Sequence, residues 1–162
     1  MVLFKKERYS QGYTLVEIMV SLTIIAIIFG TGYAAFREFS RRQVISSVIR
    51  ELVGNLRLAQ SQALAGKKPS TLACQDPNRL QGYGFRVTSA NSYRIEAACS
   101  GGDEIVKEVT VPSEVDIVAP AQNPIIFKVL GEGTNLSNDT SIVISAYDTS
   151  RSLVVTVGGT IE

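Results

Sequence analysis

The first side chain that could do chemistry is an isolated acid, Glu17, which stands directly before a long uncharged run, residues 18–36. A carboxylate beside the apolar layer of a membrane is costly unless it is paired, so such a residue is a functional hypothesis by default. The alternative is that the Glu17 side chain only extends to the membrane surface. We expect a charged partner for Glu17.

Catalytic chemistry is not expected elsewhere. The chain has no histidine, which removes the commonest general base, the Ser-His-Asp arrangement and the commonest metal ligand. Two cysteines are too few for a tetrahedral zinc site. The glycine pairs at 82–84 and 131–133 are too short for phosphate-binding loops and are interpreted as turns. The Asn- and Asp-containing loop at 132–139 does not match the calcium-loop spacing. We therefore predict no enzyme, no metal site and no cofactor.

The element that must position Glu17 is the uncharged run itself. Its length is about that needed for a helix to cross a bilayer core of roughly 30 Å. Lys5, Lys6 and Arg8 precede it, and no small-residue cleavage site follows it. Because positive charge favours the cytoplasmic side, we predict a single-pass protein of the inner membrane with a cytoplasmic N-terminus and an exported remainder.

Residues 12–17, Gly-Tyr-Thr-Leu-Val-Glu, resemble the prepilin processing motif, in which a glycine and an aromatic residue precede T-L-[VIL]-E and a long apolar helix. The resemblance implies that a prepilin peptidase removes a leader, residues 1–12, by cutting after Gly12 and then methylates Tyr13. It also implies that the new N-terminal amine, on this chain or on a neighbour, neutralises Glu17 during assembly. Tyr13 departs mildly from the phenylalanine that is usual there.

The helix is predicted to continue past the membrane. Apolar residues recur at steps of three and four and mark one stripe: Ile45, Ile49, Leu52, Leu56, Ala59 and Ala63. Gly66, followed by two lysines and Pro69, is a helix-stop signal. We therefore divide the mature chain into a transmembrane and assembly helix, 13–36, an amphipathic helix, 37–65, and a β-rich head, 66–162.

The head is predicted to consist of short strands bounded by Gly, Asn, Ser and Pro. The predicted strands are Thr71–Cys74, Tyr83–Thr88, Ser92–Ala98, Ile105–Val111, Val115–Ala119, Ile125–Leu130, Ser141–Ala146 and Ser152–Val157. A three-residue loop at 89–91 gathers Phe85, Val87, Tyr93 and Ile95 on one face and sets Arg86 opposite Arg94 on the other. The fold class is therefore α+β.

Cys74 and Cys99 are the only cysteines, and both fall in the exported part. An oxidising compartment permits a disulfide, which we favour as a structural bond. A redox pair is disfavoured because the spacing is not C-x-x-C. Two free thiols remain the alternative in a reducing exterior.

Residues 56–63, Leu-Arg-Leu-Ala-Gln-Ser-Gln-Ala, and the strand-like 71–74 also resemble the H-type minor pseudopilins of type II secretion and the related T-type minor pilins. Some members of that group bind DNA through a basic motif near the C-terminus, but here residues 158–162 contain no basic residue. Arg86 and Arg94 are the tentative anion-binding or DNA-binding residues that remain, and Glu96 could neutralise them instead.

Together these features predict a pilin-like structural subunit, a minor pilin or pseudopilin of a type IV pilus or a type II secretion pseudopilus. The implied partners are other pilin or pseudopilin subunits, the prepilin peptidase and methylase, and the inner membrane assembly platform; DNA is not expected. One alternative is a DNA-binding minor pilin of a natural-transformation pilus. Another is an anchored monomer that is never processed.

Overall fold

The computed structural model describes residues 12–147 and 149–162, apart from the side chains of residues 31, 32, 34 and 35. The predicted leader therefore lies outside the described residues, except for Gly12. The chain forms two compact units, residues 1–40 and 41–162. Within the described residues, no helix combines the length and the apolar character needed to cross a membrane.

One long helix, α1 (Leu15–Leu64), contributes to both units. Its C-terminal end is closed by glycine in the left-handed conformation, Gly66 with φ +58°. The Gly66 amide donates to the Ala63 carbonyl at 3.0 Å, and the Lys67 amide donates to the Gln62 carbonyl at 3.1 Å. This pair of hydrogen bonds is the Schellman motif, which satisfies carbonyls that the helix leaves unpaired. The helix thus ends where the sequence places its stop signal.

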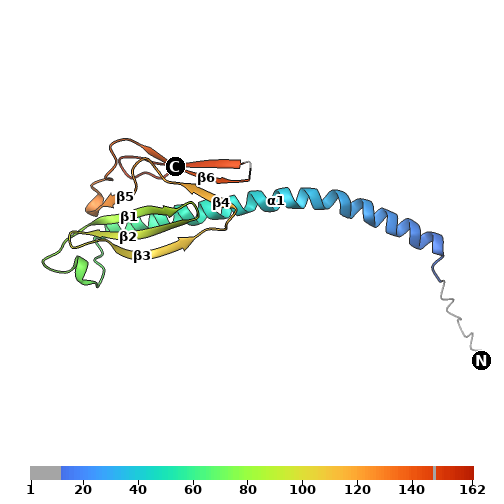
Figure 1. Cartoon of the computed structure of the whole chain (residues 1–162), viewed down its shortest axis with the longest axis horizontal. Helices are drawn as coiled ribbons and strands as arrows, with labels where there is room; N and C mark the ends of the chain where they lie inside the picture. The colour runs from blue at the N-terminus through green and yellow to red at the C-terminus, as the bar shows by residue number, and fades with distance from the viewer. Residues whose placement is uncertain (1–11, 148) are drawn as a thin grey trace, which may run out of the picture. The chain divides into compact units, whose positions relative to one another are not determined.

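The head contains two antiparallel sheets, which Figure 1 shows beside the C-terminal part of α1. The four-stranded sheet has the order β3-β2-β1-β5, and the three-stranded sheet has the order β4-β6-β7. The strands are β1 (Leu80–Ser89), β2 (Ser92–Cys99), β3 (Glu104–Thr110), β4 (Val115–Val118), β5 (Ile125–Lys128), β6 (Thr140–Ala146) and β7 (Thr149–Val155). An α+β, pilin-like architecture is therefore confirmed.

The β1–β2 hairpin has the predicted face assignment. Phe85 pairs with Ile95 and Val87 pairs with Tyr93 on the core side, while Arg86 pairs with Arg94 on the other side. A register shift between Val87 and Ser89 then brings Ser89 opposite Ser92. The side chains consequently alternate between the two faces as expected for a three-residue loop, but a β-bulge lies next to the turn.

The core lies between α1 and the two sheets. The buried stripe of α1 passes through Val48, whereas the predicted member Ile49 is only half-buried. Its members are Ile45, Val48, Leu52, Leu56, Ala59 and Ala63. They pack against inward-facing strand residues such as Phe85, Tyr93 and Ile144. Burial of this stripe stabilises the helix against the head, since helix propensity alone contributes little.

Two predictions about local structure were wrong. The segment predicted as a first strand forms a short 3-10 helix, η1 (Leu72–Cys74), whose hydrogen bonds are local and whose Leu72 is exposed. Gly82 and Gly84, predicted to form a turn, lie inside β1. A Cβ at Gly82 would collide with the Phe127 carbonyl of β5, so the glycine allows the two strands to approach closely.

Candidate assembly site and polar clusters of the head

The helix that carries Glu17 begins with a side-chain cap. Thr14 precedes α1, and its hydroxyl oxygen accepts a hydrogen bond of 3.2 Å from the Glu17 amide. Thr14 and Glu17 therefore occupy the first and last positions of a T-x-x-E capping box, the arrangement that satisfies free amides at a helix start. Sequence reasoning assigned Glu17 only an assembly role, although the spacing of Thr14 and Glu17 already indicated a capping box.

The bond predicted to be cut is accessible. Gly12 and Tyr13 lie before the first helical residue, Gly12 has open space around it, and the Tyr13 side chain is 79% exposed. Peptidases cut most readily at exposed chain outside regular structure, and Gly12 and Tyr13 are both exposed there. The Glu17 side chain is also exposed and forms no ion pair with any described residue. In the uncut chain the nitrogen of Tyr13 is an uncharged amide, so the expected partner arises only after cleavage.

The helix after Glu17 exposes apolar side chains on all sides. Ile18, Met19, Leu22, Ile25 and Phe29 are each about half or more exposed in the isolated chain. A helix that is apolar all round is stable only when it is buried in lipid or among other helices. This segment therefore needs partners that the isolated chain does not supply.

The two arginines predicted as a tentative anion site are both bound to one buried carboxylate. Glu96 is 1% exposed, with its two oxygens 2.8 Å from Nε of Arg86 and Nε of Arg94, and Arg86 also reaches Asp103 at 3.2 Å. The hydrogen bond to Glu96 raises the pKa of the Arg86 guanidinium. Gly84 leaves room for this carboxylate, because a Cβ there would lie 3.2 Å from Glu96 Cγ. Both positive charges are thus neutralised within the head.

A second polar chain joins α1 to the four-stranded sheet. The Asn55 amide nitrogen donates to the Tyr93 hydroxyl at 2.7 Å, and Lys107 donates to the Asn55 carbonyl oxygen at 2.9 Å. Glu51 lies 4.0 Å from Lys107. Because Asn55 and Tyr93 are buried, a shift of the helix along the sheet would leave these groups unpaired, which is costly. Sequence reasoning missed this series of polar contacts, since the residues that make it are far apart in sequence.

Alkaline pH is expected to weaken the head through Tyr93. Burial raises the pKa of its phenol to about 12, from 10.0. The unfolded chain therefore loses this proton first, so the free energy of unfolding is unaffected below about pH 10 and falls by about 2 to 3 kcal/mol as pH rises to about 12. Denaturant midpoints measured across this range should show the loss. Tyr93→Phe should reduce the alkaline slope, whereas Tyr147→Phe, at an exposed position, should not; an unchanged slope in Tyr93→Phe would contradict the assignment.

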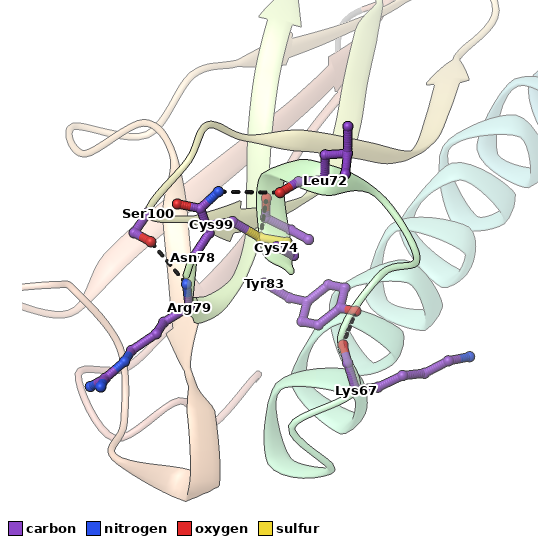
Figure 2. Close-up of a disulfide and its surroundings, with 9 residues drawn as sticks. Lys67, Leu72, Cys74, Asn78, Arg79, Tyr83, Cys99 and Ser100 are labelled. Carbon is purple, nitrogen blue, oxygen red and sulfur yellow. Dashed lines mark hydrogen bonds between the residues drawn. A yellow bond between two sulfur atoms is a disulfide. The ribbon is translucent and has the colours of Figure 1, made fainter. Parts of the chain in front are cut away.

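Cys74 and Cys99 form a disulfide with a Cα–Cα distance of 5.2 Å. Figure 2 shows that it ties the loop containing η1 to the end of β2. Hydrogen bonds from Asn78 to the Leu72 carbonyl and from the Arg79 amide to Ser100 support the same loop, and the Tyr83 hydroxyl donates to the Lys67 carbonyl. Both cysteines are buried, so the bond has the surroundings of a structural disulfide and not of a reactive one.

The oxygen donors in the loop at 132–139 take part in loop structure. The Asn135 side-chain oxygen accepts from the Ile126 amide at 2.8 Å, and the Asp139 carboxylate accepts from the Val157 amide at 2.9 Å. Among the described residues, no group of three Cys, Asp or Glu side chains is arranged to hold a metal ion. These side chains connect the loop to β5 and to the segment after β7.

An exposed apolar helix with a lone acid in its first turn, continued into an α+β head, defines the chain as a pilin-like subunit. Family models agree: residues 8–33 match the prokaryotic N-terminal methylation motif, and residues 48–160 match the type II transport protein GspH family. The second match covers more than half of the chain, which therefore belongs to the GspH family. No curated protein and no solved structure matches it significantly.

Membership of this family makes the chain a minor pseudopilin or pilin subunit. Such subunits are structural proteins, anchored in a membrane and later assembled with other pilins or pseudopilins. Neither the matched families nor the Arg86–Glu96–Arg94 cluster specifically supports the alternative of a DNA-binding pilin.

Proposed function

We propose that this chain is stored in the inner membrane as a single-pass prepilin, cut after Gly12, methylated on Tyr13 and then drawn into a pseudopilus as a minor component. The observation that carries the proposal is the position of Glu17, which is the only charged residue between the accessible Gly12–Tyr13 bond and Arg37. This arrangement lies within the matched methylation motif.

Cleavage creates the positively charged partner that the Glu17 carboxylate lacks in the uncut chain. Cutting after Gly12 turns the Tyr13 amide into an amine that carries a positive charge at neutral pH. In an apolar helix bundle, that amine on a neighbouring subunit neutralises the Glu17 carboxylate, and the unpaired acid is disfavoured. The pairing therefore selects subunits that have been processed and places each new helix in register with its neighbour.

The head displays a rigid surface on this anchor. The buried stripe of α1, the Asn55–Tyr93 hydrogen bond and the disulfide hold the amphipathic helix, 37–65, to the strands of residues 66–162. Prepilin peptidase, the inner membrane assembly platform and neighbouring pseudopilins are the proposed partners. The leader, 1–12, and the assembly helix, 13–36, complete the proposed division of the chain.

The mass of the N-terminal peptide from membranes of cells that express the full chain and a prepilin peptidase tests the proposal. We expect a peptide that begins at Tyr13 and carries one added methyl group. Gly12→Leu should leave the chain intact, because a larger side chain blocks the cut, whereas Ser10→Ala two residues upstream should be processed normally. A wild-type chain that still begins at Met1 would show that the anchor is never processed.

A further inference from the structure

An arginine-lined pocket lies where the β6–β7 hairpin meets α1 within the head. It is lined by Arg42, Ile45 and Ser46 of the helix and by Thr149 and Arg151 of β7. Beside it, the Arg41 guanidinium carbon lies 4.5 Å from the centre of the Tyr147 ring, a cation–π contact between helix and hairpin (Figure 1 shows the two elements). Arginine side chains from two separate elements therefore converge on one small pocket.

Strand register explains why Arg151 faces the helix. Arg151 pairs with Ile144, and Thr149 pairs with Ala146. Ile144 and Ala146 are buried, so their cross-strand partners lie on the same, inward side of the three-stranded sheet. Arg151 forms no ion pair with a described residue, and the Thr149 hydroxyl makes no hydrogen bond with one. Ser46, by contrast, donates to the Arg42 carbonyl at 2.9 Å.

The pocket lies close in sequence to the proposed membrane span. Arg41 follows Phe36, the last apolar residue of the run, by five residues. Five residues cover about 8 Å as a helix and at most about 17 Å when extended. The headgroup layer extends roughly 5 to 8 Å beyond the hydrocarbon core. The long apolar stem of an arginine side chain lets it place its charge several ångströms away from its own backbone.

We propose that this pocket binds the phosphate group of an anionic phospholipid in the exported leaflet. The Arg151 guanidinium would hold two phosphate oxygens, the planar arrangement that arginine favours, and the Thr149 hydroxyl would donate to a third. Arg42 adds positive charge at the same pocket. The inference rests on the proposed membrane anchor.

Lipid binding at this pocket would position the subunit in the membrane after the leader has been removed. Once the leader with its basic residues is removed, residues 13–36 contain no basic side chain, and the cationic side chains nearest the span on the exported side are those that follow Phe36, beginning with Arg37. A phosphate held at Arg151 would fix the depth and rotation of the stored subunit. Release of the lipid would then accompany entry into the filament.

Native mass spectrometry of the purified full chain in non-ionic detergent tests the proposal. The probes are phosphatidylglycerol, phosphatidylcholine with the same acyl chains, and inorganic phosphate. We expect phosphatidylglycerol to be retained in preference to phosphatidylcholine. Arg151→Gln should reduce that preference about fivefold, and Arg42→Gln with Arg151→Gln should reduce it further. Arg57→Gln, an exposed arginine elsewhere on α1, is the matched control and should bind like the wild type.

Each remaining outcome overturns the proposal in a distinguishable way. Equal retention of the two lipids, or an unchanged preference in Arg151→Gln, means that the pocket does not bind lipid phosphate. Retention of inorganic phosphate without a lipid preference identifies a soluble anion as the occupant instead. Membrane anchoring is measured separately, by resistance to alkaline extraction. Release of the chain from membranes would contradict the proposed function. An anchored chain with no lipid preference would contradict only this inference.

Discussion

Glu17→Gln protein is expected to insert in the membrane, lose its leader after Gly12 and fail to enter the pseudopilus. An amine and a carboxylate about 4 Å apart attract by roughly 4 kcal/mol at an effective dielectric constant of about 20, which corresponds to nearly a thousandfold in an assembly equilibrium. Glutamine keeps the size of the side chain but removes its charge. The measurement is the ratio of this subunit in sheared filaments to that in membranes.

Because of the capping box, Glu17→Gln tests the role of the charge more specifically than a change to alanine would. Glutamine is accepted at the last position of a capping box, so Glu17→Gln preserves the helix start that Thr14 caps. Thr14→Ala is the matched control, because it removes the cap at a cost of about 1 kcal/mol and leaves the Glu17 charge intact. We expect Thr14→Ala to assemble. Normal incorporation of Glu17→Gln would falsify the charge-pairing role.

Removal of the disulfide is the largest expected change in the stability of the head. The bond joins positions 25 residues apart, and closing a loop of that size restricts the unfolded chain by about 3 to 4 kcal/mol. That is a large part of the 5 to 15 kcal/mol typical of a whole domain. Cys74→Ser with Cys99→Ser should therefore shift the denaturant midpoint strongly downward in the detergent-solubilised chain.

Two comparisons separate the covalent constraint from the local contacts. Reduction of the wild-type chain should reproduce the effect of the double variant. Ser100→Ala removes only the hydrogen bond from the Arg79 amide and should cost about 1 kcal/mol. The loop around η1 should also become the first site of proteolysis, since its Leu72 is 85% exposed. A double variant with the wild-type midpoint would show that the loop is held by its hydrogen bonds alone.

Most of the correctly predicted features depend on residues close together in sequence. The termination of α1 before Gly66, the faces of the β1–β2 hairpin and the apolar stripe from Ile45 to Ala63 all follow from spacing within a few turns or a few strand residues. The wrong prediction at Gly82 involves a residue whose neighbour in space is distant in sequence. Gly82 indicates a turn by local rules, yet it is required in β1 because β5 approaches it closely.

Glu96 illustrates why the site of the head could not be completed from sequence. Alternation placed Arg86 and Arg94 on one face, but only the structure shows that the carboxylate between them is 1% exposed and binds both. The Asn55–Tyr93 bond and the pocket between Arg42 and Arg151 likewise join residues far apart in the chain. Their positions depend on how the helix and the sheets pack.

The sequence by itself predicted the N-terminal chemistry of this protein, namely cleavage at the Gly12–Tyr13 bond and charge pairing by the lone acid Glu17 ahead of an apolar run, and residues 8–33 match the methylation motif. Those features lie in one helix and in the few residues directly before it, where neighbours in sequence are neighbours in space. The tertiary structure decided which polar groups of the head neutralise one another and which of them line the pocket between α1 and β7. That depends on burial and on contacts between distant elements, which no local spacing encodes.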